Sequence, residues 1–120
     1  MFGWLKKKPR RLETESKWVA AIEGDLISIR DEAGLIKSVT KSDLSGVAIE
    51  TNDSGPWGAD VWWLLFDRRD RLACAFPQGA VGEETVINYV CTLPSFDHGE
   101  MIKAMASTDN AVFAVWRKQT

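Results

Sequence analysis

The sequence predicts an α+β domain: a mainly antiparallel, curved sheet of about six to seven strands, with two helices near the C-terminus. Three observations predict this class. Short apolar runs separated by turn residues follow one another up to residue 76, at the spacing of an antiparallel meander. After Gly82 the apolar residues change to helical spacing, and a short apolar run returns at residues 111–116.

Each expected strand is bounded by residues that favour turns. Glu23-Gly24-Asp25 suits a hairpin, because glycine tolerates positive φ. Residues 31–34 and the polar residues 68–71 read as further turns, and the pair Ser42-Asp43 breaks the pattern once more. The expected strands are residues 17–22, 25–30, 36–40, 47–51, 61–67, 72–76 and 111–116.

The two helices are predicted from apolar periodicity and from their ends. The first covers residues 83–93 and is stopped by Pro94. The second covers residues 97–107, where Asp97 as N-cap and Glu100 three residues later form a pair like a capping box. Two acids in the opening turn of the first helix, Glu83 and Glu84, suit the helix dipole. Four apolar residues then follow at helical spacing: Val86, Ile87, Val90 and Leu93.

The run VWWLLF, residues 61–66, is apolar on both faces of its strand. Successive side chains alternate, so three apolar residues point to one face and three to the other. Such a strand needs cover on both sides. The two helices account for one side. The other requires a strongly bent sheet, a small partly open barrel or a partner subunit, which leaves a homodimer open.

Length and composition indicate one globular domain preceded by an arm. The 120 residues are 45% hydrophobic and 27% charged. We divide them into a basic N-terminal arm, residues 1–16, and a single α+β domain, residues 17–120. No apolar run approaches the roughly 20 residues of a membrane-spanning helix, and no secretory signal is recognised. Cys74 and Cys91 show no CxxC or zinc-like spacing. Because no export signal is recognised, we expect them to be reduced thiols in the cytoplasm.

The arm differs in charge from the rest of the chain. Residues 1–12 hold five basic residues and no acid, whereas the remainder holds 10 basic and 17 acidic residues. Aromatic residues beside cations are typical of an interfacial anchor, which would place the protein at the inner face of the membrane. A solubilising or folded-back tail is the simpler interpretation, and nucleic-acid binding is disfavoured by the acidic body. The candidate membrane contacts are Phe2, Trp4, Leu5, Lys6, Lys7, Lys8, Arg10 and Arg11.

The loop before the VWWLLF run is the second candidate site. Asp53 and Asp60 offer carboxylates, but their spacing does not match a calcium loop, and the surrounding residues form turns without a ligand. Trp57 either folds back on the core or stands out as a binding anchor. The turn after the run, Asp67–Arg71, is usually a solvated hairpin tip. Its arginines are candidate contacts for an acidic partner: Arg68, Arg69 and Arg71.

The sequence contains no recognisable catalytic set. His98 is the single histidine and falls in the first turn of a capped helix, where a solvated role is expected. Cys91 has the spacing of a core residue. Residues 77–84 place glycines before a helix but lack the lysine and hydroxyl of a phosphate-binding loop. We therefore expect no enzymatic activity, no metal and no cofactor.

Four segments, ETNDSGPWGADVWW, FPQGA, LPSFD and MASTDNAVFAVW, resemble a group of small uncharacterised bacterial proteins over roughly residues 18–116. The resemblance implies no activity. The order of strands and helix is also similar to pleckstrin-homology-like domains, which bind lipids or peptides. This chain departs from them, because a strand is expected after its last helix. Size and acidity are similar to those of immunity proteins, which cover the basic sites of toxins.

These observations favour a non-enzymatic protein-interaction module in a bacterial cytoplasm, of which an immunity-like role is one version. It would bind a protein partner through an acidic surface or through Trp57. A peripheral membrane module that uses residues 2–11 is the alternative. An enzyme of unknown class comes third.

Overall fold

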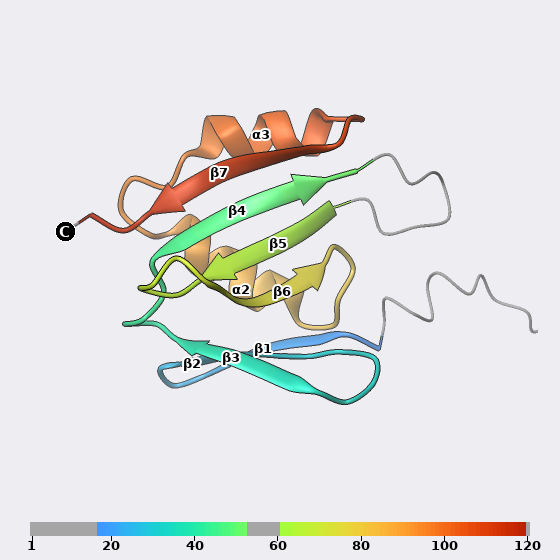
Figure 1. The fold of residues 1–120 in the computed structure, drawn as a ribbon, viewed down its shortest axis with the longest axis vertical. Helices are drawn as coiled ribbons and strands as arrows, with labels where there is room; N and C mark the ends of the chain where they lie inside the picture. The colour runs from blue at the N-terminus through green and yellow to red at the C-terminus, as the bar shows by residue number, and fades with distance from the viewer. Residues whose placement is uncertain (1–16, 53–60, 120) are drawn as a thin grey trace, which may run out of the picture.

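Two antiparallel sheets and two helices make up the described part of the protein, which in this computed structural model is residues 17–52 and 61–119 (Figure 1). The class predicted from the sequence, α+β with both helices late in the chain, is confirmed. The predicted arm, residues 1–16, and the loop residues 53–60 lie outside the described residues.

The first sheet is a three-stranded meander. Its strands are β1 (Val19–Glu23), β2 (Leu26–Arg30) and β3 (Ile36–Thr40), in the order β1-β2-β3. Gly24 turns the first hairpin with φ of 60°. In the second hairpin the Asp31 carboxylate accepts the backbone N–H groups of Ala33 and Leu35, at 2.9 and 3.0 Å. Both turns lie where the sequence predicts them.

The second sheet has four strands and includes the last strand of the chain. Its members are β4 (Gly46–Thr51), β5 (Val61–Phe66), β6 (Leu72–Pro77) and β7 (Ala111–Arg117). They are ordered β6-β5-β4-β7, and each neighbouring pair is antiparallel. β7 therefore returns from the helices to pair with β4 (Figure 1).

The expectation of one curved sheet is wrong: the seven strands form two sheets. The reason is that β4 has β5 on one edge and β7 on the other, so β3 cannot continue its meander onto β4. Beside β1, the first sheet is instead bonded to the connection that follows β6. There the N–H of Ala20 donates to the carbonyl of Val81, and the N–H of Val81 donates to the carbonyl of Trp18, both at 2.8 Å.

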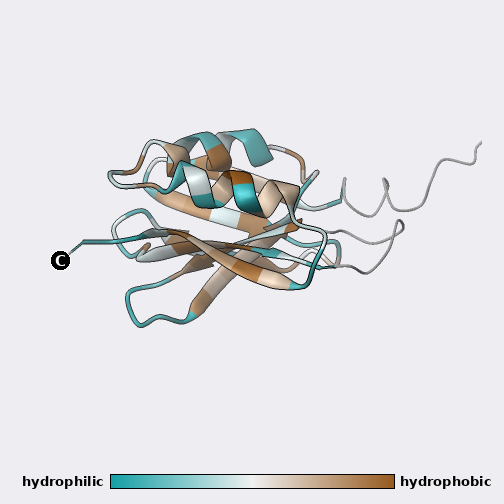
Figure 2. Cartoon of the chain, turned by 90° about the horizontal axis from the view of Figure 1, so that it is seen from above, coloured by the Kyte–Doolittle hydropathy of each residue, from teal (hydrophilic) through white to brown (hydrophobic). Residues whose placement is uncertain are grey.

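Both helices lie on the same side of the strands (Figure 2). Helix α2 (Glu83–Cys91) follows Gly82, whose φ is 81°. A Cβ atom at Gly82 would lie 2.2 Å from the carbonyl oxygen of Ala20, so this close approach to β1 requires glycine. Helix α3 is His98–Ala106.

The predicted cap of α3 is confirmed in one direction. The Asp97 carboxylate accepts the N–H of Glu100 at 2.9 Å. The Glu100 carboxylate pairs with Lys103 at 2.9 Å, and the N–H of Asp97 donates to the carbonyl of Val115. Helix α3 is thereby attached to β7 at its first turn.

The core lies between the helices and one face of the strands. The Trp63 and Phe76 rings stack with centroids 6.3 Å apart. The indole N–H of Trp63 is buried, and no acceptor for it exists within the described ranges. The fully buried core side chains include Ile27, Leu44, Val47, Ile49, Trp63, Leu65, Phe76, Val86, Val90 and Val115.

Candidate functional site

The four-stranded sheet has a second face, which we call the outer face, on the side away from the helices (Figure 2). Strand register fixes its members, since residues paired across a sheet share a face. Three rows cross the strands in the order β6, β5, β4, β7. They are Pro77, Trp62, Glu50 and Val112; Ala75, Leu64, Ala48 and Ala114; and Leu72, Phe66, Gly46 and Arg117.

The outer face is apolar and partly exposed. Trp62, Leu64 and Phe66 of β5 are half-buried and lie outside the hydrophobic core cluster. Leu72 and Val112 retain 55% and 62% of their accessible surface. The sequence predicts cover on both faces of β5, whereas Trp62, Leu64 and Phe66 are only partly covered within the described ranges. The inner face of β5 packs on the helices, whereas neither described helix lies over its outer face (Figure 2).

The residue before β1 contacts one end of the outer face. The Trp18 ring meets Trp62 edge to face, with centroids 5.3 Å apart and an angle of 85° between the rings. Such aromatic pairs contribute about 0.5–1.5 kcal/mol beyond their buried area. The contact attaches the first sheet to the Trp62 end, and Lys37 of β3 lines a cavity together with Leu72 and Ala75, so the first sheet also borders the β6 side of the outer face.

A shallow hollow of about 190 Å³ lies at the Phe66 end of the outer face. Its floor is low because Gly46 has no side chain and Ala48 and Ala114 have only methyl groups. Phe66 and Arg117 border it. A Cβ atom at Gly46 would stand 3.7 Å from the nearest atoms, so the space above this residue is open to ordinary van der Waals contact.

Basic side chains gather beside this hollow. Half of the ten basic residues after residue 12 lie in the β5–β6 turn or at the end of β7. Three of them, Arg68, Arg117 and Lys118, line a second, wider hollow of about 580 Å³ together with Ser42, Ser45 and Asp70. We call the five residues the basic end: Arg68, Arg69, Arg71, Arg117 and Lys118.

The cations that line this second hollow have weak or exposed partners. Arg68 Nε lies 2.5 Å from Asp43 Oδ1, and the Arg68 side chain is 69% exposed. Arg117 Nη1 lies 3.7 Å from Asp70 Oδ1. Lys118 Nζ donates to the carbonyl of Ser42 at 2.8 Å. Exposed pairs of this kind contribute about 0–1 kcal/mol, because water screens them and the side chains lose entropy.

The three arginines proposed from the sequence occupy different positions. Asp67 accepts the N–H groups of Arg69 and Arg71, at 2.8 and 3.1 Å, and these bonds shape the turn. The N–H of Arg71 is the main reason that the pKa of Asp67 lies below its usual value. Arg68 lines the second hollow, whereas Arg71 pairs with Asp67 at 3.4 Å and Arg69 is exposed.

The sequence reasoning missed Arg117 and Lys118. Arg117 is the last residue of β7 and Lys118 follows it, and their place beside Arg68 depends on the pairing of β7 with β4. The other proposed residues lie outside the described ones. These are Trp57, Asp53 and Asp60 of the loop, and Phe2, Trp4, Leu5, Lys6, Lys7, Lys8, Arg10 and Arg11 of the arm.

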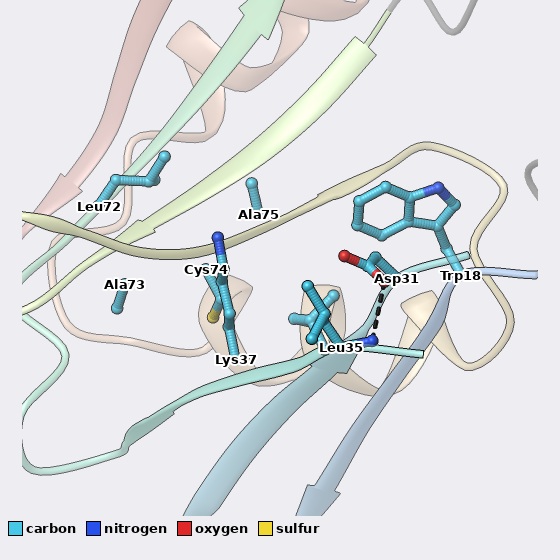
Figure 3. A pocket seen from close by; sticks show the side chains of 9 residues that line it. Trp18, Asp31, Leu35, Lys37, Leu72, Ala73, Cys74 and Ala75 are labelled. Carbon is cyan, nitrogen blue, oxygen red and sulfur yellow. Dashed lines mark hydrogen bonds between the residues drawn. The ribbon is translucent and has the colours of Figure 1, made fainter. Parts of the chain in front are cut away.

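A separate cavity of about 120 Å³ lies between β6 and the first sheet (Figure 3). Trp18, Leu35 and Leu72 contribute apolar walls, and the Lys37 side chain extends from β3 toward β6 beside Cys74. Asp31 lines the same cavity, but its carboxylate is already bonded to the hairpin backbone. The volume suits a single small apolar group.

The described thiols and histidine are poorly placed for nucleophilic or acid–base catalysis. Burial raises the pKa of Cys74 to about 12, although nearby Lys37 acts in the opposite direction. Burial also raises the pKa of Cys91. His98 is exposed, and the centroid of its ring lies 4.8 Å from that of the Phe96 ring. Within residues 17–52 and 61–119, no three His, Cys, Asp or Glu side chains are grouped to hold a metal ion.

Comparison with known proteins gives no relative: no family model, curated protein or solved structure matches this chain. Among the described helices, none combines the length and the apolar character needed to cross a membrane.

Proposed function

We propose that this protein is a non-enzymatic protein-interaction module that binds its partner through the outer face. The observation that carries the proposal is that β5 is apolar on both faces, while the described helices cover only its inner face. Contiguous exposed apolar surface on a small domain is typical of a binding site.

The size of the outer face supports this proposal. Four strands about 4.8 Å apart, each six residues at about 3.4 Å per residue, give a sheet area of roughly 400 Å², within which Pro77 and Ala48 are already buried. The largest patch on an ordinary monomer is about 300–600 Å² and is often functional. A stable complex buries about 800 Å² on each partner, so the outer face supplies the apolar centre of an interface and the basic end supplies part of its polar rim.

The chemistry of the described residues favours binding over catalysis. A thiol whose pKa is about 12 holds its proton at neutral pH, and only the thiolate is a competent nucleophile. Three further interpretations stay predictions. Contacts through Trp57 and membrane contact by the arm depend on residues outside the described ranges, and an immunity-like role depends on the identity of the partner.

The experiment compares substitutions on the two sides of the molecule. Ala114→Arg places a charge in the middle row of the outer face, on the edge strand β7, and Ile102→Arg places the same charge on α3, where Ile102 is 65% exposed. Tagged wild type and both variants are used to capture proteins from the native host, which are quantified by mass spectrometry. We expect partners recovered with the wild type and the Ile102 variant to be lost with Ala114→Arg. Equal recovery with all three baits would refute the proposal.

A further inference from the structure

We infer that the partner presents an apolar side chain next to carboxylates, with the apolar group in the hollow above Gly46 and the carboxylates at the basic end. This inference rests on the proposed function and specifies the chemistry of the partner. Its basis is the contiguity of the two hollows, which share Asp70 and Arg117 in their linings.

The apolar half of the site is shaped for one inserted side chain. Gly46, Ala48 and Ala114 leave a floor without projecting groups, and Phe66 forms a wall. The hollow of about 190 Å³ is large enough for an aliphatic or aromatic group. Burying a side chain such as leucine or phenylalanine contributes about 1.5–3 kcal/mol.

The basic half has a charge that differs from its surroundings. Arg68, Arg117 and Lys118 line the second hollow with one acid, Asp70, whereas the chain after residue 12 is strongly acidic. Incoming carboxylates would replace the exposed contacts that these cations make with Asp43, Asp70 and Ser42. Arginine also matches carboxylate geometry with two parallel hydrogen bonds.

The same charges argue against other occupants. A long polyanion such as nucleic acid would extend beyond three cations onto an acidic body, which would repel it. The outer face of a second copy of this chain would offer the three cations a single carboxylate in its three rows, that of Glu50. A short segment of a protein with two or three acids beside an apolar residue matches the site better.

The test is a selection from a random peptide library displayed on phage, with the full chain immobilised as bait. We expect the selected peptides to be enriched in Asp or Glu beside Leu, Ile, Phe or Trp. Synthetic copies are then titrated against the wild type and five variants by following the fluorescence of a dye on the peptide: Arg117→Ala, Arg68→Ala, Lys103→Ala, Gly46→Leu and Ala114→Arg. Arg117→Ala and Arg68→Ala should each weaken binding about fivefold, and the exposed control Lys103→Ala should leave it unchanged.

A filling variant and added salt test the two halves separately. Gly46→Leu should weaken binding about tenfold by occupying the hollow, with an unchanged far-ultraviolet circular dichroism spectrum as evidence of folding. Raising the salt concentration should weaken binding of the wild type more than that of Arg117→Ala, because the charge contacts are screened.

The outcomes separate this inference from the proposed function. Selected peptides without acidic enrichment that still lose binding on Ala114→Arg overturn the inference and leave the proposed function standing. Peptides insensitive to both Ala114→Arg and Arg117→Ala overturn both. Concentration-dependent dimers in sedimentation, abolished by Ala114→Arg, with no peptide enrichment, would assign the face to a second copy instead. Binding only to phosphatidylserine vesicles would assign it to lipid.

Discussion

The two faces of strand β5 have similar composition and different surroundings. On the inner face Trp63 and Leu65 are fully buried against the helices. On the outer face Trp62, Leu64 and Phe66, from the same strand β5, stay half-buried and lie outside the core cluster. Adjacent residues of equal hydrophobicity thus contribute differently, because the cover over a residue decides its energetic value.

Adjacent leucines give the largest contrast between the faces. Leu65→Ala should lower the free energy of unfolding by about 3–4 kcal/mol, since Leu65 is 0% exposed and its removal leaves a cavity. Leu64→Ala should lower it by about 1 kcal/mol, because Leu64 already contacts water. Urea unfolding followed by tryptophan fluorescence measures both. Similar losses for the two variants would mean that the outer face is covered as fully as the inner one.

Two glycines allow the same comparison between a tightly packed position and an open one to be made at the backbone. Gly82→Ala should destabilise the protein by about 2–3 kcal/mol, because its φ is positive and its Cβ would collide with the carbonyl of Ala20. Gly46→Ala on the open outer face should instead stabilise it by about 0.5 kcal/mol, since the new methyl group meets only ordinary contacts at 3.7 Å. Thermal unfolding of both variants checks the prediction, and a destabilised Gly46→Ala would contradict it.

The inner-face thiol Cys74 makes stability depend on pH. The unfolded thiol loses its proton near 9.0, whereas burial raises the folded pKa to about 12. Above pH 9 the unfolded state therefore binds fewer protons than the folded one, and stability falls by about 1.4 kcal/mol per pH unit until pH 12. Below pH 9 the thiol has no such effect.

The control for this pH dependence is Cys74→Ala, which lacks the thiol and should show a shallower decline above pH 9. Urea unfolding of both proteins at pH 8, 9 and 10 gives the difference in slope. Parallel curves would show that the thiol titrates alike in the folded and unfolded states.

The smallest effect is expected from a charge on the outer face. Ala114→Arg should change the free energy of unfolding by less than about 0.5 kcal/mol, because Ala114 is exposed and a long side chain can extend into water. The same substitution is the one that should abolish partner capture. A loss above about 2 kcal/mol would instead indicate that this position is packed inside the folded molecule.

Local sequence features predicted the elements well. Turn residues such as Gly24 and Asp31 lie where the hairpins turn, and Asp97 caps α3 as expected. The number of strands was predictable for the same reason, because the alternation of apolar residues and the turn residues between strands are local properties of the sequence. The division into two sheets was not, because it depends on which strand occupies the second edge of β4.

The candidate site was predictable only in part. Arg68 was chosen from its turn, and β5 was recognised as apolar on both faces. Arg117 and Lys118 gave no signal, because a basic pair that follows an apolar run has no distinctive spacing. Their proximity to Arg68 comes from long-range pairing, which sequence periodicity does not report.

The sequence alone determined the alternation of strands and helices, the caps and the doubly apolar character of β5, because each arises from neighbouring residues. Tertiary structure decided the rest: β7 closes one edge of β4, the helices cover a single face, and distant cations meet at one end of the sheet. The physical reason is that burial and charge proximity depend on contacts between residues far apart in the chain, and the paired edges of β4 select those contacts.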